Sequence, residues 1–142
     1  MTVDQISVFV ENRPGKLLEI TELLGQAGVD IRAMSIADTT DFGILRIIVE
    51  DTEATMTLLK NAGYIVKLNR VLAVEIPDEP GSLAKILHIF ATKELSIEYL
   101  YAFISPCAGG AYVIFRMENI DRASEVLTAN GVKLASAKQL FA

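Results

Sequence analysis

The sequence has few of the residues that build metal and disulfide sites. Its 142 residues include one cysteine, Cys107, one histidine, His88, and no tryptophan. A lone cysteine excludes an intramolecular disulfide and a thiolate metal cluster, and a lone histidine excludes a site with two histidine ligands. Cys107 also lacks a histidine partner that would activate it as a nucleophile. We therefore expect no catalytic site, no metal and no other cofactor, and we expect His88 to be a solvated helix residue.

Positive charge and long hydrophobic runs are also scarce. Lys and Arg total 13 against 18 Asp and Glu, which gives a formal net charge of -5. An acidic surface disfavours nucleic acid and anionic membranes as partners. No apolar run approaches the roughly 18 residues of a membrane span, and the first residues lack the basic and apolar regions of a signal peptide. We expect a cytoplasmic protein that binds neither nucleic acid nor membrane.

What the sequence does contain is an internal repeat. A shift of 66 residues brings Val8, Pro14, Gly15, Leu17 and Ile31 onto Val74, Pro80, Gly81, Leu83 and Ile97. A period this long indicates a duplicated small domain rather than a solenoid array. We place the two domains at residues 1–69 and 70–142, with no flexible linker between them.

Each half has the same order of predicted elements. Alternating apolar residues at Ile6, Val8 and Val10 predict a strand, and Pro14 opens a helix because proline is favoured at the first helical position. The first half continues with strands at 29–37 and 43–50, a helix at 52–62 capped by Asp51 or Thr52, and a strand at 64–68. The second half repeats this order with a strand at 71–76, a helix from Pro80, strands from Leu95 and Ala111, a helix after Asn119 and a strand at 132–137.

This order predicts the α+β class, as two ferredoxin-like βαββαβ repeats. Each is an antiparallel four-stranded sheet with both helices on one face. The sheet face opposite the helices should be polar if water covers it. Yet Tyr99, Tyr101 and Phe103 line one face of a strand, and the residues on its second face are also apolar. We expect the sister repeat or a second chain to cover it, which favours a homodimer. Stacking of RNA bases on these aromatics is disfavoured, because Glu98 lies within the strand and no basic patch surrounds it.

Two segments resemble a known family. Asn12-Arg13-Pro14-Gly15-Lys16-Leu17 and Asp78-Glu79-Pro80-Gly81-Ser82-Leu83 both place Pro-Gly-x-Leu after a first strand, as in tandem ACT domains. Gly28-Val29-Asp30-Ile31 is similar to that family's GVNI segment, with Asp30 for Asn, and Glu94-Leu95-Ser96-Ile97 departs further. The resemblance covers nearly the whole chain. It implies a regulatory protein without a catalytic domain, which binds an amino acid or similar ligand and controls a partner enzyme of amino-acid metabolism.

The resemblance places the ligand at the first strand–helix loop, near a domain or subunit interface. The first turn of a helix has unpaired backbone N–H groups at the positive end of its dipole, which can hold a carboxylate. Arg13 and Lys16 flank this turn, Gly15 permits close approach, and Asp30 is placed to meet an ammonium group. The candidate ligand-binding residues are Asn12, Arg13, Pro14, Gly15, Lys16, Leu17, Asp30 and Ile31.

The second loop is acidic, because Glu75, Asp78 and Glu79 surround it and repel a carboxylate. We expect it to be mainly structural, and its weaker candidates are Asp78, Pro80, Gly81, Ser82, Leu83 and Ser96. Two alternatives stay open. Pro-Gly is also a good way to start a helix, with Asn12 or Asp78 as a local cap. The protein is alternatively a structural interaction module that dimerises through its apolar sheet faces without a ligand.

Overall fold

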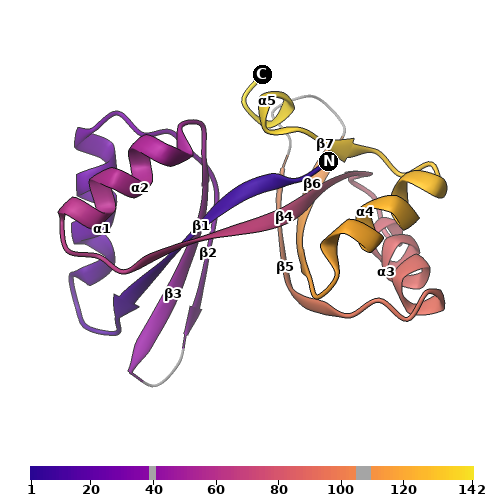
Figure 1. Cartoon of the computed structure of the whole chain (residues 1–142), viewed down its shortest axis with the longest axis horizontal. Coiled ribbons are helices and arrows are strands. Elements are labelled where there is room, and N and C mark those ends of the chain that lie inside the picture. Colours follow the sequence, from indigo (N-terminus) through magenta and orange to yellow (C-terminus); the bar gives the residue numbers. More distant parts are fainter. Residues whose placement is uncertain (39–40, 105–109) are drawn as a thin grey trace. The chain divides into compact units, whose positions relative to one another are not determined.

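The computed structural model describes residues 1–38, 41–104 and 110–142 (Figure 1). Cys107 and the turn residues Thr39 and Thr40 lie outside the described residues. The chain divides into two compact units, one formed by residues 4–69 and the other by residues 1–3 together with 70–142.

The first unit is a four-stranded antiparallel sheet with two helices. Strand β3 pairs with both β1 and β2, and the strand order is β2-β3-β1-β4, as predicted for a ferredoxin-like repeat. In Figure 1 both helices lie on one face of this sheet. The elements are β1 (Val3–Glu11), α1 (Lys16–Gln26), β2 (Ile31–Asp38), β3 (Phe42–Val49), α2 (Thr52–Asn61) and the first residues of β4 (Val66–Pro77).

The core of the first unit lies between the sheet and its helices. Alternate residues Ile6, Val8 and Val10 of β1 are buried, as the period-two pattern predicted. Helix α1 contributes Ile20 and Leu24 to the core. Leu17 and Ala27 continue the helical spacing of these two residues in either direction, and both are exposed. Leu17 is the second residue of α1, and Ala27 is its C-cap.

The second unit repeats this arrangement with the strand order β7-β4-β6-β5. Its helices α3 and α4 again lie on one face of the sheet (Figure 1). Phe90 of α3 packs edge-on against Phe115 of β6, with ring centroids 5.2 Å apart. The elements are the remaining residues of β4, α3 (Ser82–Thr92), β5 (Ile97–Ile104), β6 (Gly110–Met117), α4 (Ile120–Ala129), β7 (Leu134–Ala135) and α5 (Ala137–Leu140).

The prolines do not open the helices, which corrects the sequence prediction. Helix α1 begins at Lys16 and α3 at Ser82, each after a glycine N-cap in the left-handed region. Gly15 has φ 85° and Gly81 has φ 90°. A side chain is strained at these angles, so the Pro-Gly pair forms a turn that precedes the helix.

The last strands also differ from the prediction. The strands expected at 64–68 and 71–76 are one continuous strand, β4. Strand β7 has only two residues because Ser136 starts the short helix α5. The hydroxyl of Ser136 accepts from the Gln139 N–H, and the Gln139 side chain accepts from the Ser136 N–H, which forms a capping box. The Asp51 cap of α2 is confirmed, since its carboxylate accepts from the Ala54 N–H.

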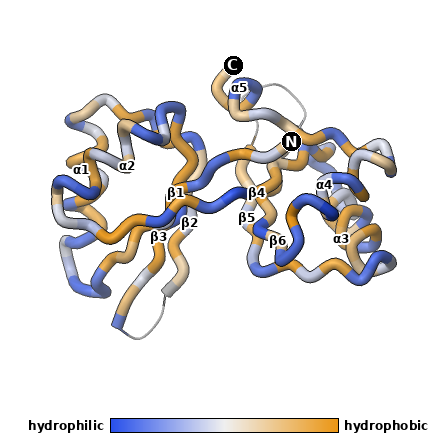
Figure 2. Tube along the Cα trace, in the orientation of Figure 1, coloured by the Kyte–Doolittle hydropathy of each residue, from blue (hydrophilic) through white to orange (hydrophobic). Residues whose placement is uncertain are grey.

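Apolar residues extend through the strands and helices of both units (Figure 2). On the sheet face of the first unit that its helices leave open, Ala33 and Ile48 are buried, whereas Phe9 and Phe42 are exposed. His88 is exposed, as expected for a solvated helix residue. No helix in the described parts of the chain is long and apolar enough to span a membrane.

Candidate functional site

The segment Asn12–Gly15 forms the turn between β1 and α1. The Arg13 N–H donates to the Glu11 carbonyl at 2.8 Å, and the Lys16 N–H donates to the Arg13 carbonyl at 3.3 Å. Gly15 is the N-cap and supplies no side chain, so the first turn of α1 has no side-chain cap. This overturns the alternative in which Asn12 caps the helix. Apart from the N–H of Lys16, the N–H groups of the first turn are available to an anion.

Two cationic side chains flank this turn. The Arg13 guanidinium lies 2.7 Å from the Glu11 carboxylate, and the Lys16 ammonium lies 3.5 Å from the Glu19 carboxylate. Ion pairs on an exposed surface contribute only about 0–1 kcal/mol. A ligand carboxylate can therefore compete for either cation at small cost in stability. Pro14 and Leu17, the other loop candidates, are both exposed beside them.

Asp30 and Ile31 lie at the other end of α1. The helix runs from Lys16 to Gln26, and its 11 residues at 1.5 Å each extend about 16 Å. Asp30 is instead paired with Arg32 at 3.0 Å. The structure thus does not bring Asp30 to the Asn12 loop within one unit, which corrects the expectation that both contact one small ligand.

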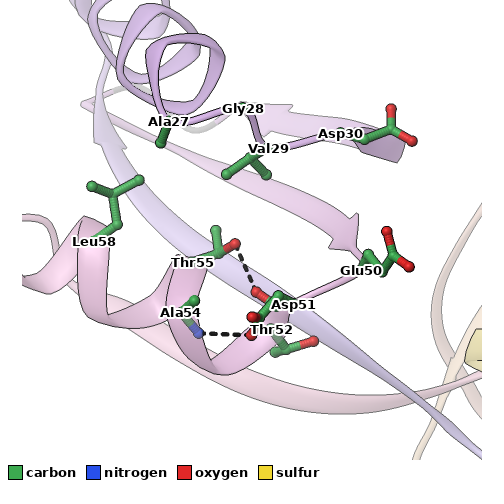
Figure 3. Close-up of a pocket in the computed structure, with 10 residues that line it drawn as sticks. All are labelled: Ala27, Gly28, Val29, Asp30, Glu50, Asp51, Thr52, Ala54, Thr55 and Leu58. Carbon is green, nitrogen blue, oxygen red and sulfur yellow. Dashed lines mark hydrogen bonds between the residues drawn. The ribbon is translucent and has the colours of Figure 1, made fainter.

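A cavity of about 970 Å³ lies at this opposite end, between the end of α1 and the start of α2 (Figure 3). Val29 and Leu58 supply apolar side chains, and Asp30, Glu50 and Asp51 supply carboxylates. In Figure 3 the Asp30 and Glu50 side chains point away from Leu58. Asp51 already serves as the α2 cap. Among the described residues, no acidic, histidine or cysteine cluster is arranged to hold a metal ion.

The second loop has the same backbone but different side chains. The Glu79 N–H donates to the Pro77 carbonyl at 3.0 Å, and the Ser82 N–H donates to the Glu79 carbonyl at 3.3 Å. Gly81 caps α3 without a side chain, so Asp78 is not the cap either. Of the remaining second-copy candidates, Pro80 is exposed, Leu83 packs against the core, and Ser96 lies past the far end of α3.

Sequence reasoning missed one polar contact near the first loop. The Tyr64 hydroxyl donates to the Glu19 carboxylate and joins the segment between α2 and β4 to α1. This hydrogen bond, together with the charge of Lys16, lowers the pKa of Glu19. Burial and the same bond raise the pKa of Tyr64 to about 12. The two residues are 45 positions apart, so no local spacing signals the pair.

The fold and the internal repeat define a tandem pair of ferredoxin-like βαββαβ domains. The family model of the ACT domain pair matches residues 1–142, and the chain belongs to this family. Protein BT0572 from Bacteroides thetaiotaomicron is a solved structure with 37% identity and a TM-score of 0.92. It covers 99% of this chain and 96% of its own. No curated protein matches the chain.

The fold is also that of a named regulatory subunit. The ligand-free regulatory subunit of aspartate kinase from Thermus thermophilus has a TM-score of 0.65 at 16% identity, covering 89% of this chain and 91% of its own. The corresponding subunit from Thermus flavus has a TM-score of 0.63 at 17% identity, covering 98% and 92%. At these identities the likeness shows the fold alone.

Proposed function

We propose that this protein is a non-catalytic cytoplasmic regulator that binds an amino acid at the Asn12–Leu17 loop. The observation that carries the proposal is the uncapped first turn of α1 between Arg13 and Lys16. Its free N–H groups can donate hydrogen bonds to a ligand carboxylate, and Gly15 has no Cβ to obstruct it. Asn12 then supplies an amide group at the edge of the loop. Binding would control a partner enzyme of amino-acid metabolism.

The second loop supports the choice of the first by contrast. Glu79 and Ser82 stand at the repeat positions of Arg13 and Lys16, on the same hydrogen-bonded turn. A carboxylate would meet a negative side chain there and no flanking cation. We accordingly assign ligand binding to the domain at residues 1–69 and a structural role to the second loop, in the domain at residues 70–142.

Asp30 and Ile31 take part in this proposal only in an assembly. Since α1 separates them from the loop within one unit, a second chain would have to bring them to the ligand. A response of amino-acid affinity to Asp30→Ala would support a site at a subunit interface. Unchanged affinity in a folded variant would restrict the site to the loop itself.

The test is a thermal-shift screen of the protein against the twenty amino acids. A ligand at 100 times its Kd adds about 2.7 kcal/mol, which raises the midpoint by about 5–10 °C in a chain of this size. Titration calorimetry then compares Asn12→Ala/Gly15→Val with the matched second-loop variant Asp78→Ala/Gly81→Val. We expect only the first pair to abolish binding, with both variants checked for folding by circular dichroism. Equal losses in both would contradict the assignment.

The exposed apolar face of the first unit favours a second candidate function. Phe9, Phe42, Ile44 and Ile65 line a shallow apolar hollow of about 510 Å³ on that face. Phe42 is 52% exposed and Ile65 is 69% exposed. Grouped exposed apolar side chains favour association, so this face supports a homodimer and, in the absence of any ligand, a purely structural module.

Light scattering after size-exclusion chromatography tests the homodimer. We expect the wild-type protein to be dimeric and Phe42→Ser/Ile65→Ser to be monomeric. Leu18→Ser on α1 is the matched control, because Leu18 is also an exposed apolar residue but lies away from this face. Loss of the dimer in both variants, or a monomeric wild-type protein, would contradict this interface. A dimer that responds to no amino acid would favour the structural module.

A further inference from the structure

Helix α4 of the second unit and helix α2 of the first end in the same hydrogen-bonded turn. At the end of α4, the Gly131 N–H donates to the Thr128 carbonyl at 3.1 Å, and the Val132 N–H donates to the Leu127 carbonyl at 3.0 Å. Gly131 has φ 74°, in the left-handed region. The two bonds and the left-handed glycine form a Schellman motif, which satisfies the last carbonyls of a helix. Helix α2 ends in the same way, with Gly63 at φ 91°.

The residue before the glycine differs between the two helix ends. It is Ala62 at the end of α2 and Asn130 at the end of α4. The Asn130 carboxamide donates to the Val126 carbonyl at 2.8 Å. Both Asn130 and Gly131 are exposed, and a Cβ added to Gly131 would meet no neighbouring atom. At this turn an asparagine side chain therefore stands next to a backbone nitrogen that no side chain shields.

Asn130 is the one asparagine of the sequence that precedes a glycine. The other four, Asn12, Asn61, Asn69 and Asn119, precede arginine, alanine, arginine and isoleucine. A side chain on the following residue hinders the approach of its nitrogen to the asparagine carboxamide, and glycine has no such side chain. Attack of the backbone on the carboxamide is therefore least hindered at Asn130.

We propose that Asn130 is a site of spontaneous deamidation. The Gly131 nitrogen attacks Cγ of Asn130, the Cγ–Nδ2 bond breaks, and Nδ2 leaves as ammonia with the proton that the Gly131 nitrogen loses. The product is a succinimide ring. Water then opens this ring by adding its hydroxyl group to one carbonyl carbon and its remaining proton to the nitrogen. Opening at Cγ gives aspartate, and opening at the main-chain carbonyl gives isoaspartate, whose backbone runs through Cγ.

The turn at the end of α4 limits the rate of this reaction. The Gly131 N–H must lose its proton, yet it is hydrogen-bonded to the Thr128 carbonyl, and the Asn130 carboxamide is bonded to the Val126 carbonyl. Both hydrogen bonds must break before the ring can close, so the reaction requires local opening of the end of α4. Two such bonds should slow the reaction by about tenfold or more relative to the unfolded chain.

Deamidation changes the turn in two ways. It replaces the Nδ2 donor to the Val126 carbonyl with a carboxylate, which only accepts, at the negative end of the α4 dipole. Isoaspartate also lengthens the backbone between α4 and Val132, which packs against the core of the second unit. Both changes lower the stability of the second unit. This modification goes beyond the proposed function, because it involves no ligand and lies outside the Asn12–Leu17 loop.

Prolonged incubation of the full chain at mildly alkaline pH, followed by peptide mapping with mass spectrometry, tests the proposal. We expect the amide to be lost progressively at Asn130, whereas Asn61, the last residue of α2, should keep its amide. The same incubation in urea should accelerate the loss at Asn130 by about tenfold or more, because the hydrogen bonds of the turn are broken there. Synthetic peptides that contain aspartate or isoaspartate at this position identify the two products by their retention times.

Asn130→Ala is the matched control, because it copies the Ala62 cap of the first unit. Incubation should lower the unfolding midpoint of the wild-type protein and leave that of this variant unchanged. An Asn130 amide that survives incubation of the native protein for as long as the Asn61 amide would overturn the proposal. Equal rates of loss at Asn130 in the native protein and in urea would contradict the protection by the turn.

Discussion

The two strand–helix loops have nearly the same backbone and opposite side-chain charge. In both, a glycine at φ 85° or φ 90° ends the turn, and equivalent N–H groups make hydrogen bonds of 2.8 to 3.3 Å. Yet Arg13 of the first loop corresponds to Glu79 of the second. The turn is set by backbone requirements that side-chain charge does not affect. The same backbone can therefore carry side chains that attract a carboxylate or side chains that repel it.

The cavities beside α1 and α3 differ in the opposite sense, because the unit with the cationic loop has the smaller cavity. Glu19 and Tyr64 line the first cavity, of about 250 Å³, and at the same repeat positions Lys85 and Val132 line the second, of about 560 Å³. Duplication of one fold has thus produced two loops of opposite charge and two cavities of different volume.

The largest expected effect comes from the cores. Phe90 and Leu24 occupy the same repeat position and are both buried. Phe90→Ala should destabilise the protein by about 3–5 kcal/mol and Leu24→Ala by about 2–5 kcal/mol, because each leaves a cavity. Denaturant unfolding measures both, and amide hydrogen exchange shows which unit opens. A loss of unfolding free energy below about 1 kcal/mol at either position would contradict the prediction that the two residues have equivalent roles in their cores.

A smaller effect tests the identity of the two turns. Gly15→Ala and Gly81→Ala should each cost about 1–2 kcal/mol, because alanine is strained at positive φ while its Cβ meets no neighbour at either position. Thermal unfolding of the two variants should therefore give matching losses of stability. If one substitution were neutral and the other strongly destabilising, the backbones would differ in solution.

The smallest effect concerns the Tyr64–Glu19 bond of the first unit. Tyr64→Phe should cost about 0.5–1 kcal/mol near neutral pH, since the bond is partly exposed. The folded pKa of Tyr64 is raised from 10.0 to about 12, so its contribution is complete below pH 10.0 and is lost as pH rises towards 12. The pKa of Glu19 is lowered from 4.5, so its contribution is present above pH 4.5 and is lost as pH falls through the folded pKa.

Denaturant unfolding of the wild-type and Tyr64→Phe proteins across this pH range measures the difference directly. The difference in unfolding free energy between the two proteins should be constant between about pH 5 and 10 and should decrease at both extremes. Absorbance of tyrosinate provides an independent readout, because one late-titrating tyrosine should disappear in the variant. A stability difference that does not vary with pH would show that Tyr64 contributes through packing alone.

Much of the fold was predictable from local patterns. The alternation of Ile6, Val8 and Val10 identified a strand, the repeated Pro-Gly pair identified equivalent loops, and Asp51 identified a helix start. Each of these signals spans only a few neighbouring residues, because strand periodicity, helix periodicity and turn geometry are local properties of the chain. Placement of Pro14 at the first helical position was wrong, because Pro-Gly is compatible with both a helix start and a preceding turn.

By itself, then, the sequence determined the duplicated α+β fold, the order of its elements and the acidic balance of the chain. Only the tertiary structure decided that Tyr64 bonds to Glu19 across one unit and that Ser82 lines a cavity in the other. The physical reason is that secondary structure follows from neighbours in sequence. A cavity depends on the volumes and charges of side chains that meet from distant segments, and no short-range pattern records which of them meet.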